Sequence, residues 1–230
     1  MKQNPVLVPR SRSARPSRPG TAQDHAAEWM TQAIIAGELA PGDHVPQEEI
    51  AKLIGVSLIP VRESMRRLEG KGLLTYRQQL GYFVAELTVE ELIPMFELRA
   101  LLEDYAVRKS IPLITDDEVD NVAKLAADCN AALEDNDIVA LAMGHWEFYS
   151  AVLGGDDQSL VLRLLRQLWE RTHAYAGSFY STDQGALGTQ RARANILQGL
   201  RERNVTAVID ALAEHRDRTQ ATLLKFVKGN

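Results

Sequence analysis

The stretch "IGVSLIPVRESMRRLEGKGLL", from Ile54 to Leu74, constrains the fold of this chain more than any other. An apolar pattern over about 47–53 predicts a short helix before it, and Gly55 supplies the turn that follows. Ser57 can cap a second helix, and Pro60 is tolerated in the first turn of that helix. Two short helices joined by a tight glycine turn form a helix-turn-helix.

The second helix has an apolar stripe, formed by Val61, Met65 and Leu68. This stripe leaves Arg62, Arg66 and Arg67 directed outward. The second helix of a helix-turn-helix can enter the major groove of DNA, where an arginine pairs with two acceptors on guanine at once. The same arginines are also compatible with a solvated face of an ordinary helical hairpin.

The flanking segments complete a module over residues 23–86. From 23 to 36 apolar residues recur at helical spacing, and the run "GELAPGDHV" after them predicts a turn. Beyond the second helix, "LLTYRQ" and "GYFVAEL" predict two strands, and the turn between them holds Gln79, Leu80 and Gly81. A hairpin next to a helix-turn-helix predicts a wing, so the module is a winged helix-turn-helix.

Beyond Leu87 the strand signals stop, and residues 87–230 predict an all-helical bundle. Thr88 with Glu91 and Thr115 with Glu118 form capping boxes, which begin two helices. Further helices are expected over about 137–153, 158–180, 188–202 and 204–227, with breaks at 154–157 and 181–188. The fold class is therefore mainly α, with a small β-hairpin wing.

Charge and composition narrow the class of protein. The 230 residues have a net charge of −5, but residues 1–20 contain five basic and no acidic side chains. This Pro-, Ser- and Arg-rich tail over 1–22 predicts disorder, and it fits either a solvated leader or an arm that contacts phosphates. No apolar run approaches the roughly 20 residues that span a bilayer, so no membrane partner is expected. The single cysteine, Cys129, fits the reducing cytoplasm.

The residues do not predict an enzyme. The five histidines show no H-E-x-x-H pattern, and no glycine-rich loop joins a strand to a helix. No nucleophile with a neighbouring base, and no pair of carboxylates with separated pKa values, stands out either.

Several runs of the chain resemble a known family. The runs "GELAPG", "EEIAKLIGVS", "PVRESMRRLEGKGLL" and "GYFVA" resemble the winged helix-turn-helix of the GntR family of bacterial transcription regulators. The body, including "ELRALLE" at 97–103, resembles the FadR-type group with an FCD ligand-binding domain. The resemblance implies a cytoplasmic homodimeric regulator, a repressor, that binds an inverted-repeat operator in double-stranded DNA and responds to a small-molecule effector.

The resemblance also implies the DNA contacts. It assigns Arg62 as the main contact to a guanine, with Ser57, Ile59 and Arg66 on the same helix and Gln78, Gln79 and Gly81 at the wing tip. Family members usually carry arginine after the "GVS" triplet, whereas this chain has Leu58. A contact to a base or a phosphate is therefore expected to be missing.

In the body, the departures from the family concern a metal site. Many FCD domains bind a divalent metal through an aspartate and three histidines. His145, Tyr149, Arg193 and His215 stand at those four positions here. An arginine repels a metal but forks onto a carboxylate, so the chain is expected to need no cofactor and to bind a carboxylate-type metabolite directly.

Two alternatives to direct carboxylate binding stay open. A divalent metal could be retained on His145 and His215, or these residues could be polar core groups without a ligand. Arg99 is expected first to pair with Glu103 on one helix face, and second to take part in the effector site.

Overall fold

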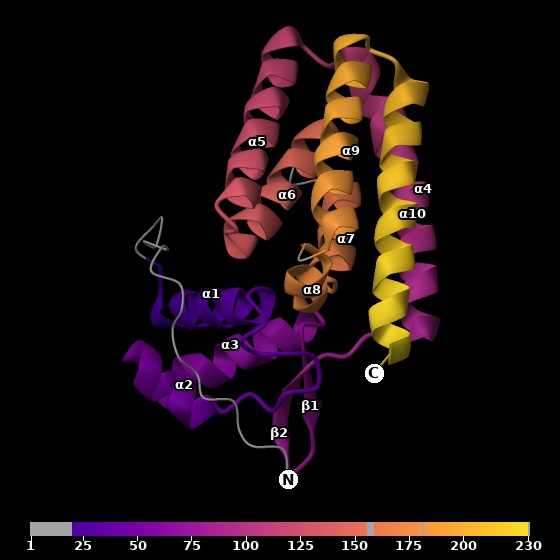
Figure 1. The fold of residues 1–230 in the computed structure, drawn as a ribbon. Helices are drawn as coiled ribbons and strands as arrows, with labels where there is room; N and C mark the ends of the chain where they lie inside the picture. The colour runs from indigo at the N-terminus through magenta and orange to yellow at the C-terminus, as the bar shows by residue number, and fades with distance from the viewer. Residues whose placement is uncertain (1–19, 156–158, 181, 230) are drawn as a thin grey trace. The chain divides into compact units, whose positions relative to one another are not determined.

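The computed structural model describes residues 20–155, 159–180 and 182–229. The basic tail lies outside these residues up to position 19, as do 156–158 in the predicted break after the glycine pair. The chain forms two compact units (Figure 1). The first contains the described residues up to Glu86 together with His173–Tyr175, and the second contains Leu87–Thr172 and the described residues from Ala176 on.

The first unit is built on three helices. They are α1 (Ala22–Ile35), α2 (Gln47–Ile54) and α3 (Leu58–Gly70). A capping box between Thr21 and Asp24 begins α1, so this helix starts one residue before position 23. Gly55 ends α2 with φ of 71°, the left-handed conformation that glycine adopts at little cost.

A common core holds these helices together. It includes Met30, Ile34, Ile50 and the predicted stripe of α3, all buried. Burial of a large apolar side chain stabilises a fold by about 1.5–3 kcal/mol. The predicted helix-turn-helix is thus packed through its apolar face, and its arginine-bearing face remains outside that core.

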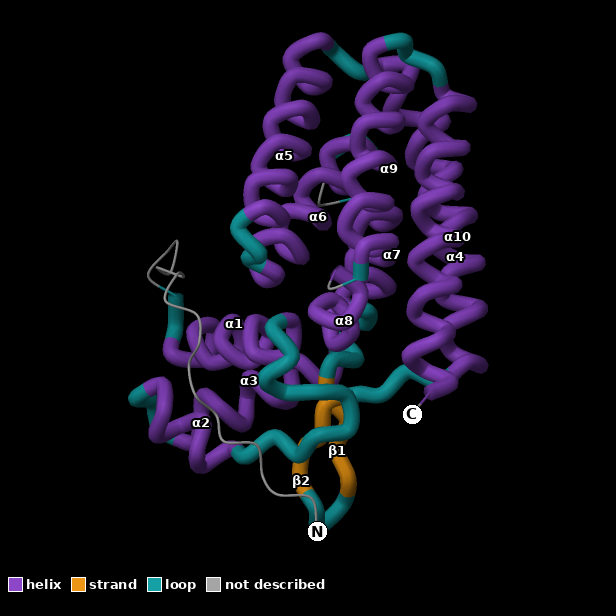
Figure 2. The backbone as a smooth tube through the Cα atoms, in the orientation of Figure 1, coloured by secondary structure: helices purple, strands orange, loops and turns teal. Residues whose placement is uncertain are grey.

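The wing is a two-stranded antiparallel hairpin, coloured orange in Figure 2. Strands β1 (Leu74–Arg77) and β2 (Gly81–Val84) pair with Arg77 opposite Gly81, so residues 78–80 form the connection. Gln79 and Gly81 have positive φ, 64° and 92°, which allows the chain to reverse over so few residues.

All the regular elements that the structure describes in the second unit are helices (Figure 2). The longer ones are α4 (Val89–Ser110), α5 (Asp116–Glu134), α6 (Ile138–Val152), α7 (Leu160–Glu170), α9 (Asp183–Arg201) and α10 (Val205–Gly229). The two predicted capping boxes, at Thr88 and Thr115, are both present. None of the helices in the described part of the chain is long and apolar enough to cross a bilayer.

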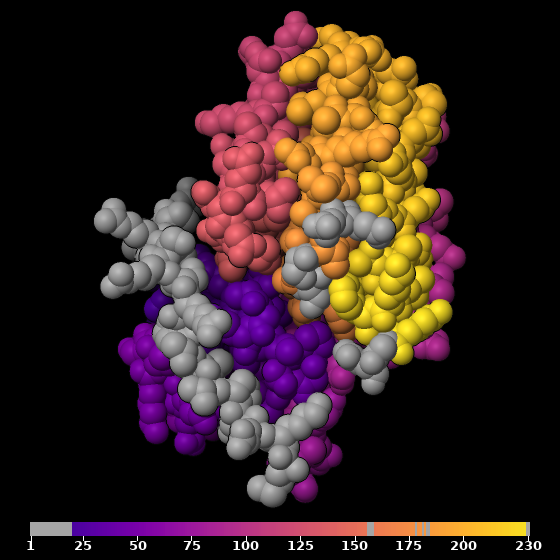
Figure 3. Space-filling model, in the orientation of Figure 1, coloured from indigo at the N-terminus to yellow at the C-terminus, as the bar shows by residue number. Residues whose placement is uncertain are grey.

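Helices α9 and α10 form an antiparallel hairpin, and α10 packs in turn on α4. Figure 3 shows the side chains of α9 (orange) and α10 (yellow) in contact on the visible face. Near the turn, Gly199 lets the two helices approach closely, since a Cβ there would lie 2.8 Å from Val208. This hairpin fixes which residues of α9 and α10 face each other.

Two predicted helix boundaries are wrong. The single helix expected over 158–180 is divided into α7, a 3-10 turn (His173–Tyr175) and the short α8 (Ala176–Tyr180). The Thr172 hydroxyl donates to the carbonyl of Trp169, a local bond that competes with continuation of the helix. Helix α9 begins at Asp183 rather than near 188, because Thr182 caps it by accepting from the amide of Gly185.

Candidate functional site

The face of α3 that bears the predicted DNA contacts is exposed. Ser57, Ile59, Arg62 and Arg66 all belong to this face. Ile59 is 69% exposed in the first turn of the helix, a position where an apolar side chain can contact a thymine methyl group. Ser57 occupies the N-cap position, but its hydroxyl accepts no capping hydrogen bond, contrary to expectation. Its extended backbone alone begins the helix.

Two arginines of α3 are held by other helices. Arg62 donates from Nε to the Oε1 of Gln47 on α2, 2.8 Å away, which orients the guanidinium. Arg67 forms an ion pair of 2.7 Å with Asp24 on α1. That hydrogen bond, with those from Thr21, lowers the pKa of Asp24 to about 2. Arg67 therefore serves the packing of α1 on α3, whereas sequence reasoning placed it simply outward.

The wing places its predicted contacts at its tip. Gln78 and Gln79 are exposed in the connection, and Gly81 begins β2. Arg77, which sequence reasoning missed, ends β1 with its guanidinium 4.3 Å from the centre of the Phe83 ring and 3.5 Å from Glu86. The alternation of β1 could have indicated that Arg77 points to one face of the hairpin.

The second unit encloses a cluster of polar aromatic side chains. His145 and Tyr149 lie one turn apart on α6 and are buried, and His215 on α10 is buried beside them. The His145 ring is 4.6 Å from that of Tyr149 and 5.3 Å from that of His215, centre to centre. Trp169 of α7, which sequence reasoning missed, lies 4.8 Å from His145 and 5.0 Å from Tyr149.

Arginines surround this aromatic cluster. Arg193 of α9 is 1% exposed and donates from Nε and Nη2 to the side-chain oxygen of Asn130, at 3.2 and 2.6 Å. Arg99 of α4 lies 4.1 Å from the Trp169 ring and donates to Glu103, as the sequence predicted. Glu103 also accepts from Arg216 at 2.7 Å. The five residues predicted for the effector site are thus all buried inside the second unit.

This interior favours neutral side chains and bound anions. Burial, together with Arg99, Arg218, Arg193 and Arg216, holds the pKa of His215 well below its usual range. Burial also raises the pKa of Tyr149, with a further contribution from the charge of Glu103. The imidazole is therefore uncharged at neutral pH, and the phenol keeps its proton and can donate it in a hydrogen bond.

Several buried polar atoms of the cluster have no hydrogen-bond partner among the described residues. They are the Tyr149 hydroxyl, Trp169 Nε1, Arg193 Nη1 and His215 Nδ1. Buried polar groups in native proteins are rarely left unpaired, because each costs about 1–3 kcal/mol. Atoms of this kind, gathered in one place, fit a site that hydrogen-bonds a small ligand.

The donor set does not fit a metal ion of the kind that FCD domains bind. Within the described residues, no group of three or more His, Cys, Asp or Glu side chains could hold a metal. Two of the four family positions hold Tyr149, whose phenol keeps its proton, and Arg193, whose charge repels a cation.

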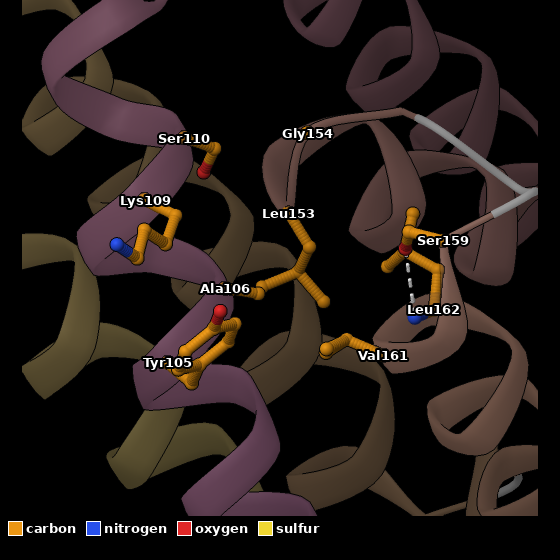
Figure 4. A pocket seen from close by; sticks show the side chains of 9 residues that line it. All are labelled: Tyr105, Ala106, Lys109, Ser110, Leu153, Gly154, Ser159, Val161 and Leu162. Carbon is orange, nitrogen blue, oxygen red and sulfur yellow. Dashed lines mark hydrogen bonds between the residues drawn. The ribbon is translucent and has the colours of Figure 1, made fainter.

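A separate surface cavity of about 330 Å³ lies between α4, the end of α6 and the start of α7 (Figure 4). Its lining is largely apolar, with the side chains of Tyr105 and Lys109 at one side and Leu153 toward the middle. None of its lining residues is one of the predicted effector residues, so it is distinct from the buried cluster.

A winged helix-turn-helix with exposed arginines, joined to a helical bundle with a cationic interior, defines a ligand-responsive DNA-binding protein. The model of the gntR family of bacterial regulatory proteins matches residues 22–84, and that of the FCD domain matches residues 94–218. The chain belongs to the GntR family, in the FadR-type group that carries an FCD domain. It is a DNA-binding transcription regulator and not an enzyme.

Relatives agree in both sequence and fold. An uncharacterised HTH-type transcriptional regulator of Bacillus subtilis, YdhC, is 25% identical over 81% of this chain and 84% of its own length. The transcriptional repressor GlaR of Escherichia coli is 26% identical over 64% of this chain and 69% of its length. The structure of E. coli McbR/YncC matches with a TM-score of 0.75 at 20% identity, covering 88% of this chain and 97% of that one.

Proposed function

We propose that this regulator is a repressor whose affinity for its operator is controlled by a small carboxylate bound inside the helical bundle. Arg193 forks onto the carboxylate, and Tyr149, His145 and His215 complete the hydrogen bonds. Arg99, paired with Glu103 and stacked on Trp169, adds a fixed positive charge. The assignment as a repressor is supported by one relative, GlaR, which is named a repressor.

The observation that carries this proposal is the state of Arg193. Its side chain is almost completely buried, yet its partner is the neutral amide of Asn130 and its Nη1 has none among the described residues. A buried charge without a counter-charge is costly, and a bound carboxylate removes that cost through charge-assisted hydrogen bonds. The same physics gives the site its preference for anions over neutral ligands.

The effect on DNA binding follows from linkage. An effector changes operator affinity only if the DNA-competent and DNA-incompetent states of the protein bind the effector with different affinity. A coupling of about 1–3 kcal/mol is typical and corresponds to a 5–150-fold change in affinity.

Arg193→Ala tests the effector site. It is expected to abolish binding of carboxylates and the response of the operator complex to them, while the affinity for operator DNA without effector stays unchanged. Calorimetric titration with a carboxylate panel and gel shifts on a selected operator measure the two effects. Arg201→Ala, an exposed arginine near the end of α9, is the matched control. If the operator complex of Arg193→Ala still responds fully to carboxylates, the carboxylate does not bind at this site.

For DNA, we propose that α3 contacts bases and the wing contacts the backbone. Arg62 contacts a guanine, Ile59 a thymine methyl group, and Ser57 and Arg66 the flanking phosphates or bases. Gln78, Gln79 and Gly81 lie at the wing tip, where a glycine allows a close approach to the sugar-phosphate chain. The hydrogen bond from Arg62 to Gln47 supports this assignment, since it limits the orientations of the guanidinium before DNA arrives.

We further propose that the active form is a homodimer on an inverted repeat. One recognition helix contacts only a few base pairs, and two-fold symmetry doubles the number of contacts. An exposed apolar surface on α4 and α7 supports this. It comprises Leu98, Leu101, Tyr105, Leu160 and Leu164. Several large apolar side chains exposed on neighbouring helices are typical of protein interfaces.

A further inference from the structure

We propose that the effector is a dicarboxylate of four to six carbons, with one carboxylate on Arg193 and the other on Arg218. This inference rests on the proposed effector site and names the class of ligand that it takes. Arg218 is not among the residues that the sequence pointed to, and its position depends on the packing of α9 against α10.

Arg218 is held in the interface of the α9–α10 hairpin. Its guanidinium lies against Gly188 of α9, where a Cβ would come within 2.8 Å of Nε and Nη1. The side chain is 22% exposed, but Nε and Nη2 are buried and have no hydrogen-bond partner among the described residues. Its one carboxylate neighbour among the described residues, Glu214, is 3.8 Å away and half-exposed. Two donors of a guanidinium are therefore fixed in the interior without an acceptor.

Arg218 belongs to the same interior as the proposed site. It lies three residues after His215 on α10, so both side chains are on one face of the helix. Its positive charge is one of those that lower the pKa of His215, beside the charge of Arg193. The charges of the two arginines, one on α9 and one on α10, thus act on the same imidazole.

The charges of the cluster are unbalanced. Arg99 and Arg216 share the single carboxylate of Glu103, and Arg193 bonds the neutral Asn130. In the described part of the chain, Arg218 pairs only with Glu214, 3.8 Å away. These four arginines thus have two carboxylates between them among the described residues, which leaves an excess of two positive charges. A ligand with two negative charges neutralises the remainder, whereas a monoanion leaves one buried charge uncompensated.

The length of a short dicarboxylate is similar to the helical spacings between these residues. With a helical rise of about 1.5 Å per residue, Arg218 is anchored about 4.5 Å along α10 from His215, and its contact Gly188 about 7.5 Å along α9 from Arg193. With carbon–carbon bonds of about 1.5 Å, a chain of four to six carbons separates its terminal carboxyl carbons by roughly 4–6 Å. Each guanidinium can then fork onto its own carboxylate.

Calorimetric titration of the full-length wild-type protein tests this without any variant. The probes are succinate, glutarate and adipate, each beside the monocarboxylate of equal length, butyrate, pentanoate and hexanoate, and inorganic phosphate. At least one dicarboxylate is expected to bind at least tenfold more tightly than its matched monocarboxylate. Equal affinity within every pair, or preference for phosphate, overturns the dicarboxylate and leaves the carboxylate site standing. If no organic acid binds at millimolar concentration, both the dicarboxylate proposal and the proposed carboxylate site are overturned.

Variants assign the second carboxylate to Arg218. Arg218→Gln is expected to reduce the dicarboxylate affinity to that of the monocarboxylate and to leave the monocarboxylate affinity within twofold. Gly188→Ala, whose added methyl displaces the guanidinium, is expected to act in the same direction. Arg193→Gln is expected to abolish binding of both, and Arg201→Gln to change neither. An unchanged preference for the dicarboxylate in a folded Arg218→Gln protein overturns the assignment.

Discussion

At the scale of single residues, His215 shows how an environment sets a charge. The side chain is buried among Tyr149, His145 and four arginines, so protonating it would add a positive charge to an interior that already holds an excess. Its imidazole is therefore neutral in the folded protein at a pH where the unfolded chain begins to bind a proton.

This predicts a loss of stability in acid. The folded-state pKa of His215 is lowered and the unfolded value is about 6.5, so below pH 6.5 the unfolded chain binds more protons than the folded one. The free energy of unfolding then decreases by up to about 1.4 kcal/mol per pH unit from this group.

Urea unfolding of the wild type and His215→Gln between pH 5 and 8 measures the effect. The variant is expected to lose less stability on acidification, whereas His25→Gln, an exposed control on α1, is expected to follow the wild type. Parallel pH profiles for all three proteins would show that His215 is not the group responsible.

At the scale of elements, α3 combines a buried stripe with an exposed face, and its neighbours decide which arginines remain available. Arg67 is tied to Asp24 of α1, whereas Arg62 is only oriented by Gln47 and keeps its Nη donors. Arginines five residues apart on one helix thus have different expected roles.

Arg62→Ala is expected to weaken operator binding by about 1–3 kcal/mol and to relax specificity at one base pair. Arg67→Ala is expected to leave operator affinity nearly unchanged while lowering the stability of the first unit, since it removes the ion pair between α1 and α3. Fluorescence anisotropy on the operator and its single-base variants distinguishes the two. Wild-type affinity of Arg62→Ala at all salt concentrations contradicts the assigned orientation of α3.

Leu58→Arg restores the residue that the family usually has after the glycine-valine-serine triplet. Leu58 is half-buried at the start of α3, so its Cβ is close enough to the surface for a long side chain to reach solvent. Binding to operator and to random DNA is expected to increase, and the salt slope to steepen by about 0.9 for one added phosphate contact. Titrations between low and high salt measure this slope, and an unchanged slope contradicts a phosphate contact there.

At the scale of the whole molecule, association of two chains is expected to bury the apolar surface of α4 and α7. A stable interface of standard size covers about 800 Å² on each partner, which requires more than the few isolated apolar groups that any surface carries. Leu101 is 69% exposed and stands between Leu98 and Tyr105 in the sequence of α4.

Leu101→Glu is therefore expected to convert a dimer into single chains, because it places a charge in a desolvated contact. Sedimentation equilibrium at micromolar concentration gives the mass of each form. Leu113→Glu, which alters an exposed leucine outside this surface, is the control and is expected to remain dimeric. A wild-type mass of one chain, unchanged by operator DNA, excludes the homodimer.

The sequence alone determined what depends on near neighbours in the chain. Capping boxes such as Thr88 with Glu91 join residues three apart, and the apolar stripe of α3 repeats within a few turns, so both could be predicted with the winged helix-turn-helix and the helical body. Arg99 and Glu103, four apart on one helix, were predicted as a pair for the same reason.

Tertiary structure alone decided what depends on distant partners. Arg67 bonds a residue 43 positions away and Arg193 one 63 positions away, and Arg218 faces Gly188 only because α10 folds back on α9. The end of α7 and the start of α9 were misplaced because local threonine hydrogen bonds override the helical pattern there. The sequence gives the chemistry of each side chain, but the packing of the helices decides which charged side chains lie close together in the interior.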